Sequence, residues 1–136
     1  LILGNPTKTG YDFVAWYTAS DLETPIASIS ASDLGEINLY AKWVPKVYKV
    51  VLATDGGTLT AGSNITSYTY GSAVILPASN EISKNGYTFT GWSDGTNIVT
   101  EIPISSIGDK TYTAAWEIVT YEIAYELNGG INSGDN

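Results

Sequence analysis

The sequence predicts a β-rich α+β fold with little helix, built from small units that repeat along the chain. Hydrophobic residues make up 43% of the 136 residues, and fourteen glycines accompany abundant threonine, valine, isoleucine and tyrosine. These residue types favour strands and tight turns. The stretch KTGYDFVAW at 8–16 also returns as KNGYTFTGW at 84–92. Few windows show the i, i+3, i+4 spacing of an amphipathic helix.

The repeat has a period of about 73 residues. LYAKW at 39–43 is followed at this distance by YTAAW at 112–116, and YKVVLATDGG at 48–57 by YEIAYELNGG at 121–130. We therefore divide the chain into three parts. Residues 1–47 are expected to form the C-terminal part of one repeat, residues 48–119 one complete repeat, and residues 120–136 the first strand and turn of the next.

Each repeat is expected to open with a strand that ends in a tight turn. In residues 121–127, apolar side chains alternate with glutamates and alanine, which is the pattern of a strand with one buried and one wet face. Tyr48, Val50 and Leu52 take the apolar face in the preceding copy. Asp-Gly-Gly or Asn-Gly-Gly follows each strand, and these residues favour the positive φ of a tight turn.

Three further strands complete the predicted unit. Residues 67–76 read as a strand broken at Gly71, and residues 111–116 close the unit. In the strand at 86–92, Trp92 has the wrong parity to share a face with Tyr87 and Phe89, which predicts a bulge near Gly91. A short helical turn is expected at residues 104–107. Four strands per unit predict small, mostly antiparallel or mixed four-stranded sheets.

Composition excludes several classes of function. Six lysines stand against fourteen acidic residues, a net charge of −8, so a polyanion such as nucleic acid is not an expected partner. No run approaches the ~18 apolar residues of a membrane helix, so membrane insertion is not expected. The chain has neither cysteine nor histidine, which excludes disulfides and thiolate chemistry. No cofactor is expected.

These motifs resemble the Listeria–Bacteroides repeat, also called the internalin B-repeat. The residues that carry the resemblance are DGG at 55–57, YG at 70–71, GYTFTGW at 86–92 and LYAKW at 39–43. The resemblance covers nearly the whole chain. The chain departs from the usual pattern at Ala15, Ser93, Thr113 and Ala115, which indicates that surface positions vary freely and are poor candidates for a shared binding site.

The resemblance implies a fold, a location and a role. The fold is a small β-grasp, ubiquitin-like module, present in tandem in large bacterial cell-surface or secreted proteins. The implied role is a stalk or an adhesion segment. The expected partners are then neighbouring repeats of the same polypeptide, and either a host surface protein or a glycan.

The aromatic residues have two interpretations. A unit this small needs large side chains to bury enough area, so the repeated aromatics are expected to form the core. Exposed tyrosines would instead stack on sugars. Tyr17, Tyr40 and Tyr68 are the candidates, because they lack an aromatic counterpart in the other repeat or because the sequence does not fix which face of the sheet they point to. The structural signature of the repeat comprises Tyr11, Phe13, Trp16, Trp43, Gly56, Gly57, Tyr87, Phe89, Trp92 and Trp116.

No catalytic or metal site is expected. Asp55, Asp94 and Asn97 are too few for the six to eight oxygens around calcium, and turn chemistry explains them better. Serine without histidine or a Ser-x-x-Lys motif argues against nucleophilic catalysis. Lys42 is the one interior candidate for an intramolecular isopeptide bond, but its counterpart is Ala115, so such a bond would not be a property of every repeat.

The sequence therefore favours a non-enzymatic structural spacer whose repeats contact their neighbours. Residues 44–47, VPKV, are expected to act as a short linker that limits bending, because proline fixes φ. The alternative is a binding module for a carbohydrate or for a host or matrix protein. The split repeats at the two ends also suggest end-to-end self-association, because unpaired strand edges seek partners.

Overall fold

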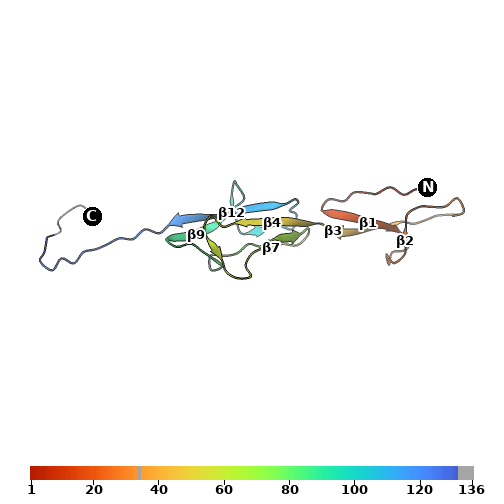
Figure 1. Cartoon of the computed structure of the whole chain (residues 1–136). Coiled ribbons are helices and arrows are strands. Elements are labelled where there is room, and N and C mark those ends of the chain that lie inside the picture. Colours follow the sequence, from red (N-terminus) through yellow and green to blue (C-terminus); the bar gives the residue numbers. More distant parts are fainter. Residues whose placement is uncertain (34, 132–136) are drawn as a thin grey trace.

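The computed structural model describes residues 1–33 and 35–131 as an elongated β-structure (Figure 1). Two sheet-containing units follow one another along it, an N-terminal unit up to residue 45 and a larger unit over residues 47–118. Residues 119–131 extend away from the larger unit. The described residues contain no helix, and so none that could cross a membrane. The predicted β-rich class with small antiparallel and mixed sheets is confirmed. The α+β class and the four-stranded sheets are wrong, because the described residues form an all-β structure whose two main sheets have three and five strands.

The N-terminal unit is a three-stranded antiparallel sheet. Its central strand is β1 (Tyr11–Tyr17), which pairs with β2 (Pro25–Ile26) on one side and β3 (Tyr40–Pro45) on the other. The strand order β2-β1-β3 places the repeated motif KTGYDFVAW on the central strand.

The larger unit is built on a five-stranded mixed sheet of order β10-β9-β12-β4-β6. Its central pair, β12 and β4, is parallel, and its other pairs are antiparallel. Two short antiparallel pairs, β11-β7 and β5-β8, complete the unit. The strands are β4 (Val47–Ala53), β5 (Thr58–Leu59), β6 (Ser67–Thr69), β7 (Val74–Ile75), β8 (Ile82–Ser83), β9 (Tyr87–Ser93), β10 (Ile98–Val99), β11 (Glu101–Ile102) and β12 (Lys110–Ile118).

The predicted bulge near Gly91 is present. On β9, Phe89 pairs with Trp116 and Gly91 with Ala115, which leaves Thr90 as an extra residue. The extra residue resets the alternation of side chains, so Trp92 reaches the same face as Phe89 and their rings lie 5.4 Å apart. The register of β1 shifts in the same way between Phe13 and Ala15.

The core of the larger unit lies against the inner face of the mixed sheet. Trp92 is 1% exposed, and its indole Nε1 donates a hydrogen bond of 2.8 Å to the carbonyl of Pro77. A buried indole keeps its hydrogen bond in this way while its ring fills the core. Of the tandem aromatic positions, Tyr87 lies outside this core and is 40% exposed. The buried residues are Val50, Tyr68, Leu76, Ile82, Trp92, Ile102, Tyr112 and Ala114.

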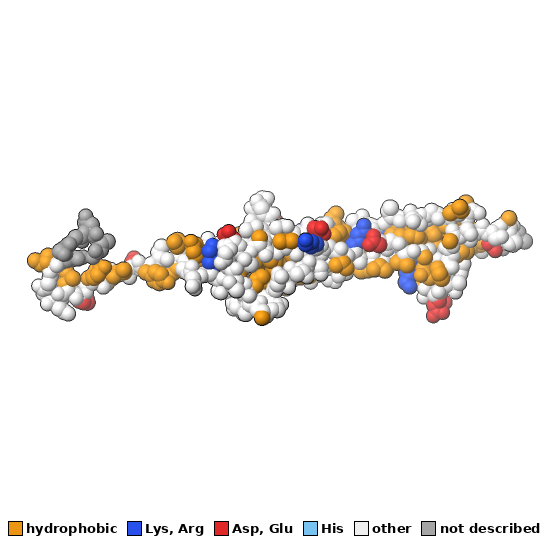
Figure 2. All heavy atoms as spheres, in the orientation of Figure 1, with side chains coloured by type: hydrophobic (Ala, Val, Ile, Leu, Met, Phe, Trp, Pro, Cys, Tyr) orange, Lys and Arg blue, Asp and Glu red, His pale blue; other side chains and the backbone are white. Residues whose placement is uncertain are grey.

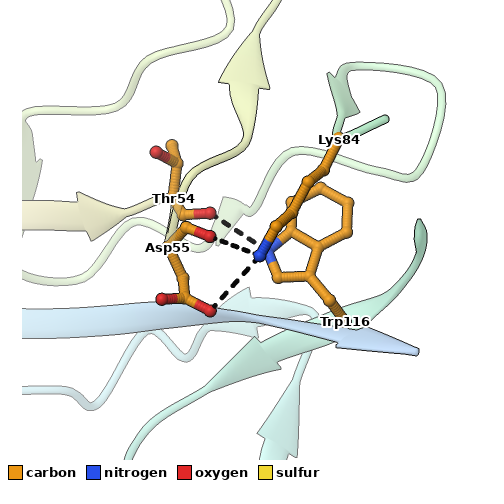
Figure 3. Close-up of polar contacts among 4 residues, drawn as sticks. All are labelled: Thr54, Asp55, Lys84 and Trp116. Carbon is orange, nitrogen blue, oxygen red and sulfur yellow. Dashed lines mark hydrogen bonds and ion pairs between the residues drawn. The ribbon is translucent and has the colours of Figure 1, made fainter. Parts of the chain in front are cut away.

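Side chains from other parts of the repeat hold the Asp-Gly-Gly turn after β4 in place (Figure 3). Asp55 and Gly56 have φ of 48° and 82°, as a tight turn requires. The Lys84 ammonium donates to the Asp55 carbonyl at 2.8 Å, and the Trp116 indole donates to the Thr54 carbonyl at 3.0 Å. A Cβ at Gly57 would overlap the Trp116 ring, so only glycine allows this packing.

The predicted helical turn at residues 104–107 is wrong. The segment forms a reverse turn in which the Ser106 N–H donates to the Pro103 carbonyl, and no second helical bond follows. Ile104 and Ile107 are more than half exposed, so no apolar face stabilises a helix there.

The predicted strand at 121–127 is not formed either. Within residues 1–33 and 35–131 these residues have no ladder partner and their side chains are exposed, although Asn128 and Gly129 adopt the expected positive φ of the turn. The equivalent strand β4 pairs with β6 and β12, and the described residues hold no such partners for residues 121–127. The alternation of apolar and polar residues therefore gives only an extended segment, because a β-strand is stabilised by pairing with a neighbouring strand. The rest of the predicted third part, residues 132–136, lies outside the described residues.

Replacing Trp92 by alanine should lower the free energy of unfolding by about 3–5 kcal/mol, because it empties the centre of the core. Thermal or urea unfolding followed by circular dichroism measures this loss. Ile104→Ala, at a residue that is 59% exposed, is the control and should change stability by less than about 0.5 kcal/mol. Equal stabilities for the two variants would contradict this core.

Alkaline pH should destabilise the larger unit. Burial raises the pKa of the Tyr68 and Tyr112 phenols above their ordinary value, so folding favours the neutral form. Their contribution is complete below the unfolded pKa of about 10 and is lost as pH rises through the folded values. Urea titrations from pH 8 to 11.5 should show a shallower decline for Tyr112→Phe than for the parent; identical slopes would contradict the assignment.

Candidate functional site

The three tyrosines proposed as ligand platforms do not form one exposed surface, although Tyr17 on β1 and Tyr40 on β3 are register partners. Tyr68 is 3% exposed, and its hydroxyl donates to the Gly108 carbonyl at 2.7 Å. Tyr17 is 6% exposed, and the Lys42 ammonium lies 5.4 Å from its ring centre. Burial therefore weighs against Tyr17 and Tyr68 as stacking surfaces. Tyr40, at the start of β3, is 40% exposed and keeps a ring open to solvent.

The turn acids are occupied with backbone hydrogen bonds. One carboxylate oxygen of Asp94 accepts from the N–H of Asn97 at 2.7 Å and of Thr96 at 2.9 Å. These bonds hold the pKa of the Asp94 carboxyl below its ordinary value, because they favour the charged form. Within the described residues there is no group of three or more acidic side chains able to hold a metal ion.

Each unit has a shallow apolar groove at the same place in the repeat. In the larger unit it has a volume of about 350 Å³ and is lined by Phe89, Trp92 and the residues around Pro77. Its counterpart in the N-terminal unit measures about 250 Å³ and is lined by Phe13 and Trp16. The groove is thus a repeated feature of the surface, although sequence reasoning did not single it out.

The junction between the units is a continuous backbone connection. Lys46 alone separates β3 from β4, so VPKV is strand rather than a loop between domains. The Lys46 N–H donates to the Gly10 carbonyl of the N-terminal unit at 2.9 Å. The Lys46 carbonyl accepts from the Tyr70 N–H of the larger unit, also at 2.9 Å. One residue is thereby fixed to both units.

A tyrosine–glycine contact covers this junction. The Tyr70 ring lies edge-on to the Tyr11 ring with centres 5.4 Å apart. The same ring packs against Gly10, where a Cβ would overlap it, and Gly10 also has a φ of 77°. A side chain at position 10 would therefore meet both steric and backbone strain. We call Gly10, Tyr11, Lys46 and Tyr70 the inter-repeat joint.

Electrostatics add little to the joint. The Lys46 ammonium lies 3.5 Å from the Asp12 carboxylate, but both side chains are well exposed, and exposed ion pairs stabilise weakly. Among lysines on the face shown in Figure 2, several lie beside acidic side chains. The joint thus depends on hydrogen bonds and packing.

Sequence reasoning missed the joint as a site. In the sequence, Tyr70-Gly71 is a motif of the repeat, and Gly10 is part of the recurring KTGY stretch. The available signal was the recurrence of that glycine as Gly86, before an equivalent tyrosine. Nothing in the one-dimensional pattern pairs Tyr70 with Gly10, which lies in the preceding repeat.

Comparison with known proteins finds the same repeat elsewhere. A "Putative Gly-rich membrane protein" of Evansella cellulosilytica is 33% identical over 93% of the chain, and a "Putative membrane protein" of the same organism is 34% identical over 92%. Internalin H of Listeria monocytogenes is 34% identical over 65% of the chain. The matched regions are 16%, 18% and 15% of these relatives, so the chain spans less than a fifth of their length.

No solved structure matches the chain significantly. Two segments, residues 2–42 and 48–115, match the family described as the Listeria-Bacteroides repeat domain. The two matches correspond to the two units of the fold and leave residues 43–47, which include Lys46 of the joint, between them. The chain therefore belongs to the Listeria-Bacteroides repeat domain family, in tandem copies.

Proposed function

We propose that this chain is a non-catalytic structural spacer within a bacterial cell-surface or secreted protein. Its repeats stack end to end through the inter-repeat joint and hold the array extended. The single observation that carries the proposal is Lys46, whose two backbone groups bond to opposite units while Tyr70 packs on Gly10. A chain whose units share such a joint resists bending.

The elongated arrangement supports the same role. The two units follow one another along one axis, and β3 leads into β4 with one intervening residue (Figure 1). A mobile tether would instead need a flexible linker of glycine and serine. Length is then gained by adding repeats, since each repeat contacts its neighbours only.

We also propose that the complete repeat is a β-grasp module over residues 48–119. The supporting feature is the parallel pair formed by its first and last long strands, β4 and β12, at the centre of a mixed sheet. Antiparallel partners, β6 and β9, flank that pair. The connection between β6 and β9 carries short strands in the place where a β-grasp fold usually has a helix.

The proposed cell-surface location of this chain is supported by the names of its relatives and by its net charge. Two relatives are named as membrane proteins and a third as internalin H, and we extend that setting to this chain as a proposal. A net charge of −8 keeps a crowded array soluble.

A binding module is the second candidate, favoured by the groove that recurs over Phe13–Trp16 and Phe89–Trp92. A repeated apolar groove, together with the exposed tyrosine Tyr40 of the N-terminal unit, suits a carbohydrate or an extended peptide of a host or matrix protein.

The spacer proposal predicts that the two units tumble as one body. Residual dipolar couplings from residues 11–45 and 47–118 should fit one common alignment tensor. Inserting Gly-Gly-Ser-Gly between Lys46 and Val47 should give two different tensors, because it separates the hydrogen bonds at Lys46. The same insertion after Gly95, in an exposed turn, is the control and should keep the common tensor. Independent tensors in the parent chain would contradict the proposal.

The binding alternative predicts saturable binding to a glycan array or to extracellular-matrix proteins. Under the spacer proposal, the folded chain should show none. Binding that is lost in Tyr40→Ala, or in Trp16→Phe with the fold intact by circular dichroism, would favour the binding module instead. Thr60→Ala, away from both features, serves as the control.

A further inference from the structure

The far end of the complete repeat carries a second copy of the surface on which Tyr70 sits. In the N-terminal unit, the Tyr11 N–H donates to the Lys8 carbonyl at 3.1 Å; in the larger unit, the Tyr87 N–H donates to the Lys84 carbonyl at 3.1 Å. Gly10 and Gly86 have φ of 77° and 78°. The two turns therefore have similar backbone conformations.

The strand that leaves each unit is attached in the same way. The Lys46 N–H donates to the Gly10 carbonyl at 2.9 Å, and the Val119 N–H donates to the Gly86 carbonyl at 2.9 Å. Lysine ammonium groups also lie over the two tyrosine rings, Lys8 at 4.1 Å from the Tyr11 centre and Lys84 at 4.4 Å from the Tyr87 centre. Val119 therefore holds the place at the second end that Lys46 holds at the joint.

The two copies differ in what covers them. Gly10 is buried beneath the Tyr70 ring, whereas Gly86 is exposed and a Cβ there would meet no atom of the described residues within 4 Å. Tyr87 is 40% exposed and Ile118, beside it on β12, is 64% exposed. The second surface thus has the shape and backbone of an occupied one, without the occupant.

Building on the spacer function proposed above, we propose that Gly86, Tyr87 and Val119 form a docking socket for the tyrosine of a following repeat that corresponds to Tyr70. The ring would lie on Gly86 with its edge toward Tyr87, and its N–H would donate to the Val119 carbonyl. The occupant is specified by the first joint, where the same surface already holds a Tyr-Gly pair. Each repeat would then dock on the preceding repeat through its Tyr-Gly turn, and its Gly-Tyr turn would form the docking socket for the following repeat.

The segment after the socket fits this partner. Its apolar side chains are exposed, Tyr121 at 81% and Ile123 at 73%, and Figure 2 shows hydrophobic side chains along this stretch. In the larger unit the corresponding Tyr48 and Val50 are covered, with Tyr48 5.3 Å from Tyr68. A following repeat that docks its tyrosine at Gly86 would supply the strand pairs that cover residues 121–127.

A matched pair of glycine variants in the present chain tests the contact. Gly10→Ala and Gly86→Ala impose the same positive-φ strain, but only Gly10→Ala also meets a tyrosine ring. We expect Gly10→Ala to abolish the common alignment tensor of the two units, and Gly86→Ala to preserve it. The near-ultraviolet circular dichroism of the Trp92 core reports that the larger unit stays folded in both.

The socket itself is tested by replacing residues 120–136 with a second copy of residues 47–118. In this longer chain, the appended copy should share an alignment tensor with the original repeat. Gly86→Ala, or Tyr70→Ala within the appended copy, should abolish the shared tensor, while Gly62→Ala, an exposed glycine with open space around it, should not.

The outcomes separate the socket from the spacer function. If Gly10→Ala loosens the first joint but Gly86→Ala leaves the appended copy aligned, the socket is overturned and the spacer proposal stands. If the parent units already tumble independently, the spacer proposal itself fails. If the appended copy tumbles freely without any substitution, a following repeat does not dock at Gly86.

Discussion

The packing of one phenylalanine between two tryptophans is the interaction on which the rest of the structure depends. Phe89 meets Trp92 and Trp116 edge-on, with centres 5.4 Å away in each case, and Phe13 meets Trp16 and Trp43 at 5.6 Å. A unit of this size has few residues with which to build a core, so these rings must bury much of its apolar area. The bulge after the phenylalanine follows from this need, because plain alternation would turn the second ring outward.

Glycines allow side chains to pack closely against the turns and against the neighbouring repeat. Gly57 allows the Trp116 ring to lie against the Asp-Gly-Gly turn, and Gly91 allows Ile98 to approach the bulge. Gly10 does the same for Tyr70 across the joint. In each place a flat or branched side chain rests where a Cβ would stand. The aromatic and glycine positions of the motif therefore belong to the same contacts, because each glycine leaves the space that the neighbouring side chain fills.

In the proposed spacer role, stiffness and length are the physical properties that an array of these repeats would provide. The main chain passes between units within β-structure, and a single residue bonds to both sides. Because these contacts are local, every added repeat lengthens the array without altering the contacts already made. The acidic surface, interrupted by few lysines, opposes association between arrays more than it shapes the fold. The proposed mechanical function would require no cleft and no reactive group.

The sequence alone determined the β-class, the repeat, the turn at Asp55, the strand break at Gly71 and the bulge at Gly91, because each of these follows from alternation or from residues that tolerate unusual backbone angles. Only the tertiary structure decided the rest. Tyr68 is equally compatible with a surface and a core until its neighbours Tyr48 and Gly108 are known. The segment at 121–127 has the pattern of a strand, yet remains extended because strand formation depends on a partner. Tyr70 and Gly10 belong to different repeats, and their contact arises only when the chain brings two distant turns to one junction.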